Sequence, residues 1–550
     1  MASPMPSMQL TPMLGQYLVA INGFVGAQNE QALAGYMPIE PPFHDPTMQQ
    51  IIAELQQTYP PGHEDALEGK CSDALTVARD GIEGSPSWSQ FTRFVVQYLT
   101  YIRDVGLDED QYYQTYEMLY ELQKRANSAL THATLGNLML PIVVGFAKVI
   151  CKLAIFIDKH PERFAHLKPN RGGGEDDGPS STLPERAAEL LRGGLTTCLN
   201  DRFSSIEDGR VQGKKRGIYL IANVCLKIFF QCRKTRNASM IFTNIGNLSP
   251  PLSSYPRAQR VTYLYYLGRF WFQNSHLDRA RLALQSAYDE SPAVQQCWHQ
   301  RRLILIFLIA SNIILGRFPS EPIFERREAK GLAQHFRPLM QAIRTGNLAL
   351  FRQHMDMDGP HADFFFYYRI LLQLRDRCEV LVWRSLVRKT WILSGTRYTS
   401  GGQPPLVDIK NLVGIFGLLE GRAAKHAEVA WVDPDFAGVE FDGPTPDPNA
   451  ITPLKMESIL SSLVTQGFLQ GFIAHRQAKF VFTRVKQAGG DVLAAGFPTP
   501  WKTIERKIAQ SGFADEVPGW KQGAPGSMAA GGGGGGMVIN MSGARPVGAT

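Results

Sequence analysis

The chain has 550 residues, of which 44% are hydrophobic and 19% are charged, and its net charge is +7. This composition excludes a fibrous or wholly disordered chain and is typical of an ordinary soluble protein with about two to four structural units. The small positive charge permits anionic partners without requiring them.

The cysteines and the apolar runs indicate in which cellular compartment the protein is expected. The seven cysteines are an odd number without a C-x-x-C pair, and several stand in apolar helical runs. Reduced core cysteines of this kind indicate an intracellular compartment, and the N-terminus lacks the pattern of a signal peptide. The apolar run 138–157 contains two lysines and the run 303–315 is short, so we expect no membrane insertion.

The first third of the chain has helical periodicity. Residues 9–34 resemble an amphipathic helix that the proline-rich stretch 37–46 interrupts, and the pattern from 49 to 157 is helical again. We therefore predict an N-terminal helical or flexible segment, 1–48, and an N-terminal helical region, 49–167. The glycine-rich stretch 168–184 lacks the G-K-[ST] of a phosphate loop, so it is predicted to be a flexible linker.

Residues 185–394 are predicted to form stacked helical hairpins. One hairpin follows the spacing of a tetratricopeptide-type repeat, in which small residues let two helices approach and a proline ends the second helix. The matching residues are Leu264, Leu267, Gly268, Trp271, Ala280, Leu284, Ala287 and Pro292. Arrays of such hairpins are scaffolds for binding other proteins.

Residues 395–486 carry the pattern of a winged helix. A helix is expected over 407–422, followed by an acidic insertion, 423–450, and a second helix over 452–466 with Gly467 at its C-cap. The hydrophobic period then changes to two on both sides of a polar turn at 475–478, which predicts a hairpin or wing. The C-terminal tail, 487–550, is predicted to be largely disordered.

The predicted fold class is mainly α: a helical-repeat (TPR-like) solenoid followed by a C-terminal winged-helix subdomain. Four strings occur in this order: AQRVTYLYYLGRFWF, RRLILIFLIASNIILGRFPS, TGNLALF and LVTQGFLQGFIAHRQAKFVFTR. Together they resemble the PCI domain. They are similar both to the PCI-domain subunit of the TREX-2 messenger-RNA export complex and to its relative associated with the COP9 signalosome.

This resemblance implies a non-enzymatic subunit without cofactors. It implies pairing with a larger PCI-containing scaffold subunit and with a very small acidic protein shared with the proteasome lid. It also implies a basic surface for RNA at the nuclear pore, and hence a nuclear location. The resemblance does not separate the export complex from the COP9 signalosome.

The winged-helix region is basic. Residues 384–486 without the insertion contain eleven Lys and Arg against three acidic residues, a net charge of +8. Such clustering suits contact with RNA or DNA phosphates, although solvated surface charges would give the same pattern. The candidate phosphate contacts are Lys455, Arg476, Lys479, Arg484, Arg388 and Lys389. The helix 452–466 contains no arginine, so base-specific readout by a transcription factor is not expected.

Two further sets of residues have an open interpretation. The hairpin phenylalanines Phe468, Phe472, Phe480 and Phe482 are expected in the core, since winged helices of PCI proteins also serve in protein pairing. Arginines along the repeat helices would form a second surface for an acidic partner, or local ion pairs on a solvated face. They are Arg257, Arg260, Arg269, Arg279, Arg281, Arg301 and Arg302.

Motifs for catalysis or metal binding are missing from the sequence. No H-E-x-x-H, G-x-S-x-G or kinase motif occurs, and the histidines lack metal-ligand spacing with cysteine or carboxylate. We therefore predict no catalytic residues, no metal and no cofactor.

Overall fold

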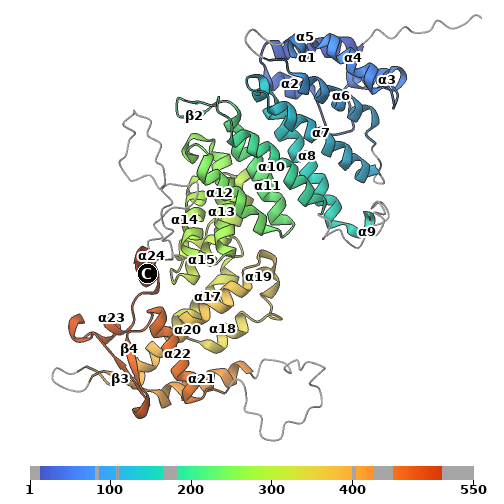
Figure 1. Ribbon diagram of the computed structural model, residues 1–550. Coiled ribbons are helices and arrows are strands. Elements are labelled where there is room, and N and C mark those ends of the chain that lie inside the picture. The colour runs from blue at the N-terminus through green and yellow to red at the C-terminus, as the bar shows by residue number, and fades with distance from the viewer. Residues whose placement is uncertain are drawn as a thin grey trace, which may run out of the picture.

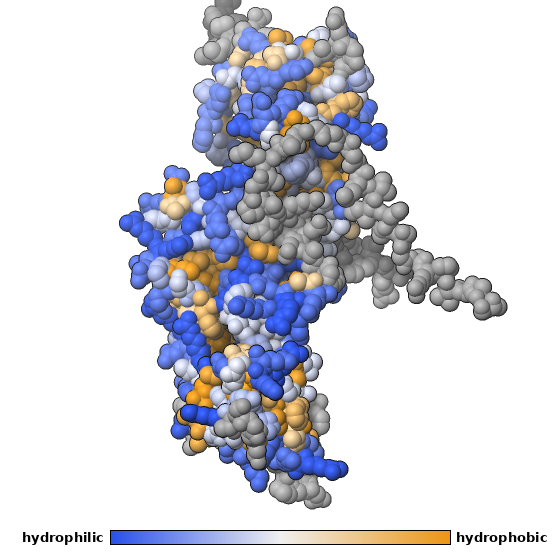
Figure 2. Space-filling view, turned by 90° about the vertical axis from the view of Figure 1, so that its left-hand side faces the viewer, coloured by the Kyte–Doolittle hydropathy of each residue, from blue (hydrophilic) through white to orange (hydrophobic). Residues whose placement is uncertain are grey.

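The computed structural model describes residues 13–80, 86–106, 108, 111–164, 182–398, 404–424 and 450–510. Figure 1 shows an elongated molecule in which helices succeed one another in chain order, from the N-terminal helices at one end to a small sheet at the other. The fold is mainly α, a helical-repeat solenoid that ends in a winged helix, as the sequence predicts. Figure 2 shows one face that is mostly hydrophilic, with hydrophobic residues gathered in its middle and in a recess above the lower end.

The N-terminal part forms one packed unit. Its helices are α1 (Met13–Gly26), α2 (Glu30–Tyr36), α3 (Pro46–Thr58), α4 (Glu64–Ala74), α5 (Thr76–Asp80), α6 (Ser89–Asp104), α7 (Tyr112–Leu130), α8 (Leu140–Lys159) and α9 (Pro161–Phe164). The Tyr98 and Tyr101 hydroxyls of α6 each donate to a carbonyl of the proline-rich stretch, at 2.9 Å. The predicted boundary at residue 48 falls within α3, so residues 13–48 belong to the same unit as the helices that follow.

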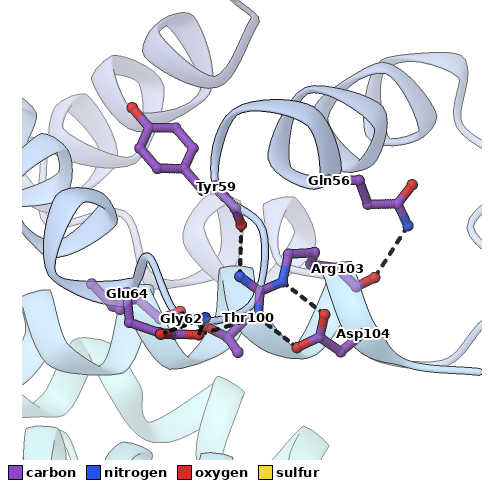
Figure 3. Close-up of polar contacts among 8 residues, drawn as sticks. Gln56, Tyr59, Gly62, Glu64, Thr100, Arg103 and Asp104 are labelled. Atoms are coloured by element: carbon purple, nitrogen blue, oxygen red, sulfur yellow. Dashed lines mark hydrogen bonds and ion pairs between the residues drawn. The ribbon is translucent and has the colours of Figure 1, made fainter.

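A buried arginine ties the loop after α3 to α6 (Figure 3). The Arg103 side chain is only 2% exposed, and its guanidinium donates to the Tyr59 carbonyl and to Asp104, each at 2.7 Å. Glu64 of α4 lies 3.4 Å from the same guanidinium. The hydrogen bond to Asp104 raises the pKa of Arg103 above its usual value, although burial opposes the charge.

One helical stretch, Leu135–Lys159, is long and apolar enough to cross a membrane. In the structure 61% of its most apolar window is buried, and α8 packs against α7, α10 and α11. Most of the apolar side chains of this stretch therefore pack within the protein core.

The middle of the molecule is the repeat stack. It consists of α10 (Leu183–Leu199), α11 (Ile218–Gln231), α12 (Ala238–Leu248), α13 (Arg257–Gln273), α14 (Leu277–Glu290), α15 (Trp298–Ile314), α16 (Glu321–Phe324), α17 (Ala333–Thr345), α18 (Leu348–His354), α19 (Ala362–Tyr368) and α20 (Leu371–Ser394). A short hairpin of β1 (Ile206–Glu207) and β2 (Arg210–Val211) follows α10. Thr182 and Glu185 form a capping box that starts α10 two residues before the predicted helix start.

The predicted repeat hairpin is α13 and α14. A Cβ added to Gly268 of α13 would lie 2.5 Å from Cγ of Leu284 in α14, which is closer than side-chain atoms can approach. Ala280, Leu284 and Ala287 are fully buried on the facing side of α14. The small residue at position 268 is therefore what lets the two helices pack closely, as the spacing predicts.

The winged helix contains β3 (Leu406–Asp408), α21 (Ile409–Ala424), α22 (Pro453–Gln466), β4 (Gly471–Ala474) and β5 (Lys479–Phe482). The strands form an antiparallel sheet in the order β3-β5-β4. The prediction of a helix from 407 was wrong at its start, because residues 407 and 408 continue β3. Most of the predicted linker 168–184 and of the acidic insertion 423–450 lies outside the described residues.

The described part of the predicted tail is folded, which corrects the boundary at 487. It forms α23 (Val492–Gly496) and α24 (Pro500–Gln510). In Figure 1, α24 lies beside the repeat stack near α15, where Arg317 pairs with Glu505 and lies 4.4 Å from the Trp501 ring centroid. This packing returns the chain to the stack after the sheet, and residues 511–550 lie outside the described range.

Candidate binding surfaces

The helix α22 and the hairpin after it form where the sequence places them. Thr452 caps α22 by accepting from the Lys455 amide at 3.2 Å, and Gly467 ends the helix with a φ of 78°, a conformation that glycine adopts without strain. The chain then enters β4 directly. The change of hydrophobic period at Gly467 is therefore a true helix-to-strand boundary.

The sheet has an inner and an outer face. On the inner face Phe482 packs against Phe480, with centroids 5.1 Å apart, and against Trp391 of α20 at 5.9 Å. Residues directly opposite each other in neighbouring antiparallel strands share a face. Val481 of β5 lies opposite Leu406 and Phe472, and Lys479 lies opposite Asp408. We call Leu406, Asp408, Phe472, Lys479 and Val481 the outer sheet face.

Phe472 corrects the prediction that all four hairpin phenylalanines are core. Phe468, Phe480 and Phe482 are buried, whereas Phe472 is 53% exposed. Its partner in β5 is Val481, so it lies on the opposite side of the sheet from Phe480 and Phe482. A large aromatic ring is thereby presented to solvent on the outer sheet face.

The turn end of the hairpin holds two of the predicted phosphate contacts. Arg476 lies in the turn and is exposed, and Lys479 begins β5 and is half-buried on the outer sheet face. His475 of the same turn lies 2.9 Å from the carboxylate of Glu457, which fastens the wing to α22. Lys455 is half-buried in the first turn of α22, two residues from Glu457.

Arg484 lies at the other end of the hairpin. It follows β5 with a φ of 62° and is exposed, as is Lys486. At about 3.3 Å per residue, roughly 16 Å of strand separates position 484 from Lys479. The wing therefore carries basic side chains at both ends, and not in one cluster.

Arg388 and Lys389 lie on α20 and are exposed. The Lys389 ammonium lies 3.5 Å from the Thr345 carbonyl, on the side where α20 meets the turn between α17 and α18. Arg384, one turn before Arg388, donates to the carbonyls of Phe497 and Pro498, both at 2.9 Å. Burial, together with the nearby Arg388, lowers the pKa of Arg384 to about 10.

The arginines predicted to bind an acidic partner are mostly engaged within the chain. Arg260 pairs with Glu290 at 2.7 Å, and Arg281 pairs with Asp278 at 3.0 Å. Arg269 lies 4.8 Å from the centroid of Phe230 and bonds Tyr265 at 3.2 Å, and Arg279 lies 5.1 Å from the centroid of Trp271. Each of these four arginines therefore has a local contact within the chain, which is the alternative that the sequence left open.

Sequence reasoning missed three features of this region. They are the outward direction of Phe472, the contact between His475 and Glu457, and the role of Arg384 in holding the segment after the sheet. Strict alternation through β4 could have shown that Phe472 and Ile473 face opposite ways. Nothing local in the sequence indicates the other two, because their partners are 18 and 113 residues away.

Reactive and metal-binding chemistry has little support among the described residues. In that part of the chain no group of three or more His, Cys, Asp or Glu could hold a metal ion. All seven cysteines are free, and burial raises the pKa of Cys151 to about 11. A thiol of this kind is a core residue and a poor nucleophile.

The amino-acid sequence is similar to those of several known proteins. No family model matches the chain. The chain is 25% identical over 495 residues to a PCI domain-containing protein of Schizosaccharomyces pombe, covering 88% of this chain and 96% of that protein. It is 26% identical over 348 residues to PCI domain-containing protein 2 of Danio rerio, covering 63% of this chain and 72% of the relative.

A third relative is a protein CSN12 homolog of Neurospora crassa, 27% identical over 377 residues, with 63% of this chain and 79% of the relative covered. The match to the Schizosaccharomyces pombe protein is long enough to include both the repeat stack and the winged helix. The chain is thus similar to PCI domain-containing proteins over most of its length, and its helical stack that ends in a winged helix supports a PCI-domain fold.

Proposed function

We propose that this chain is a non-enzymatic scaffold subunit that pairs with a larger PCI-containing subunit through the outer sheet face. The observation that carries the proposal is the exposed Phe472 ring on a face whose other side is filled by core phenylalanines. Leu406 and Val481 flank Phe472 on that face. Covering the exposed half of this ring stabilises a complex by about 1 kcal/mol.

Two charged residues lie beside the apolar residues and would orient a partner on the outer sheet face. Lys479 and Asp408 are opposite each other at one end of the outer sheet face, toward the turn of the hairpin. Charged groups at the edge of an interface fix orientation and association rate more than affinity. A partner strand or helix with a complementary pair of charges would therefore dock in one register.

Affinity purification of the tagged full chain from nuclear extract tests the proposal. Recovery of a second PCI-containing subunit is the expected result, and recovery of no PCI protein would refute it. The same purification separates the two complexes that the sequence resembles. Signalosome subunits without export factors would assign the chain to the COP9 signalosome, and export factors would assign it to a TREX-2-type complex that couples transcription to messenger-RNA export.

A second candidate function is sequence-tolerant binding of RNA or DNA along the wing. It is favoured by Arg476, Arg484 and Lys486, which are exposed and have no ion-pair partner in the described part of the chain. α22 exposes Ser458, Ser461 and Thr465 but no arginine. Contact would therefore be with phosphates, and affinity would fall steeply with salt.

Charge reversal tests this second function. Changing Arg476, Arg484 and Lys486 to Glu, which leaves the outer sheet face intact, should weaken RNA binding by the purified chain with its partner at least about tenfold at low salt, and should flatten the salt dependence. The matched control is Arg79→Glu, an exposed arginine of the N-terminal part. Equal binding by the triple variant and the control would exclude the wing as the RNA site.

The remaining parts of the proposal rest on the resemblance. They are the nuclear location and the very small acidic partner shared with the proteasome lid. Since Arg260, Arg269 and Arg281 are engaged within the chain, they give this partner no defined site. Mass spectrometry of the same purified material would detect the small protein directly.

A further inference from the structure

A groove of about 460 Å³ lies where the repeat stack meets the winged helix and α24. Its apolar residues come from five helices or their ends, which are distant in sequence. They include Leu282 of α14, Leu315 after α15, Leu381 of α20, Phe468 after α22 and Ile504 of α24. We call this the junction groove.

The rim of the junction groove is basic. Arg377 and Lys507 line it and are exposed. The Arg377 guanidinium donates to the Ser275 hydroxyl at 3.2 Å, and the Lys507 ammonium donates to the Thr465 carbonyl at 3.0 Å. Neither cation has a carboxylate partner among the described residues. The acidic residue of the lining, Asp278, is already paired with Arg281 at 3.0 Å.

The groove is therefore suited to a short segment with apolar and acidic side chains. Apolar contact would cover the floor, and carboxylates would meet two cations that have neutral partners only. This combination is more specific than an apolar patch alone, because it fixes which residue types must stand next to one another in the occupant.

The chain itself supplies such a segment directly after α24. Lys507 and Ile508 in the last turn of α24 line the groove, and the sequence continues from 511 to 550. Residues 513–520 read FADEVPGW, and Asp515 and Glu516 are the only acidic residues in 511–550. Three extended residues span up to about 10 Å, so position 513 is within reach of the groove from the end of α24.

We propose that residues 513–520 of this chain dock in the junction groove. Phe513, Val517 and Trp520 would contact the apolar floor, and Asp515 and Glu516 would face Arg377 and Lys507. A short tether gives a docked segment an effective concentration in the millimolar range. The segment would then hold α24 and the winged helix against the stack, and a competing peptide would have to displace it. This inference does not depend on pairing through the outer sheet face.

The test uses the full chain and a fluorescein-labelled peptide with the sequence of residues 511–522. The chain variant Phe513→Ser, Val517→Ser and Trp520→Ser removes the apolar side chains that would contact the groove. Its own segment should therefore leave the groove open to the peptide. This variant should bind the peptide at least about tenfold more tightly than the wild-type chain, whose own segment competes. The control variant Val538→Ser and Ile539→Ser changes apolar residues elsewhere in 511–550 and should behave as wild type.

Charge reversal locates the binding. Arg377→Glu and Lys507→Glu, added to the triple variant, should weaken peptide binding about tenfold, and a peptide with Asp515→Lys and Glu516→Lys should restore it. Restoration would also show that the groove variant is folded. Failure of the triple variant to bind the peptide would overturn the proposal. Equal binding by wild type would also overturn it, and so would a wild-type dimer that the triple variant loses, since the occupant would then be a second copy.

Discussion

Single buried charges in this molecule are held by pairing. Arg103, Lys214 and Arg301 are each at most 6% exposed, and each contacts a carboxylate within 3.5 Å. A buried cation of this kind is costly unless its hydrogen bonds are satisfied. The contacts of Arg103 join α6 to the loop after α3 and to α4, which are about 40 residues away in sequence.

Arg103→Met is expected to destabilise the N-terminal unit. The substitution removes the donors to Tyr59 and Asp104 and leaves those acceptors poorly satisfied, at a cost of about 1–3 kcal/mol. Urea unfolding followed by fluorescence would show a lower midpoint. Arg79→Met is the control, because the Arg79–Asp80 pair is exposed at 48% and 61%, and such pairs contribute less than about 1 kcal/mol. Equal midpoints for the two variants would contradict the structural role of Arg103.

His335 gives the stability of the stack a pH dependence. Burial, then His361, His354 and Arg302, lower the pKa of His335 from 6.5 to about 4. Its ring also stacks on Phe364, with centroids 3.8 Å apart. Between pH 6.5 and 4 the unfolded chain binds a proton at this position and the folded chain does not, so stability is lost as pH falls through this window.

The variant His335→Gln should therefore lose less stability than wild type between pH 7 and pH 5. Urea midpoints at the two pH values measure the difference. His299→Gln, at an exposed histidine, is the matched control and should follow the wild type. A wild-type pH dependence in the His335→Gln variant would show that this histidine does not contribute.

At the scale of elements, local signals predicted the helices and the wing. The helical spacing around Gly268 and the C-cap at Gly467 each correspond to an observed feature. The sequence could not predict β3, which has three residues and directly precedes a helix, because strand pairing with β5 is a long-range contact. It could not predict α24 either, because a short helix of mixed composition is stabilised by packing onto the stack.

The candidate site was less predictable than the fold. Basic residues could be counted from the sequence. The pairing of β4 with β5, however, is needed to show that Arg476 and Arg484 lie at opposite ends of the hairpin and that Phe472 lies on the outer sheet face. In the same way, Arg260 and Arg281 are engaged within the chain because they form ion pairs with Glu290 and Asp278. Such partners are set by the packing of helices, which composition and spacing do not specify.

Two glycine substitutions separate close packing from helix propensity. Gly193 in α10 has no atom within 4 Å of an added Cβ, so Gly193→Ala should stabilise the protein by about 0.5–1 kcal/mol. Gly268→Ala should instead destabilise it by about 1–3 kcal/mol, because the new methyl group meets Leu284. Thermal unfolding midpoints should shift in opposite directions. A stabilising Gly268→Ala would contradict the close approach of α13 and α14.

At the scale of the whole molecule, the stack and the winged helix act as one scaffold. The stack leads into α20, whose Trp391 packs on the inner face of the sheet, and α24 returns from the sheet to the stack. The outer sheet face is thereby held at one end of an elongated body (Figure 1). A face presented in this way suits rigid attachment of a second subunit, since little order is lost on binding.

The measurement that tests this account most directly compares Phe472→Asp with Phe203→Asp in the tagged full chain. Both positions carry exposed phenylalanines, at 53% and 72%, but only Phe472 lies on the outer sheet face. With equal thermal stability, Phe472→Asp should reduce the recovery of the PCI-containing partner at least about tenfold, as loss of a central aromatic contact does. Phe203→Asp should recover it as wild type does. Undiminished recovery with Phe472→Asp would show that pairing does not use the outer sheet face.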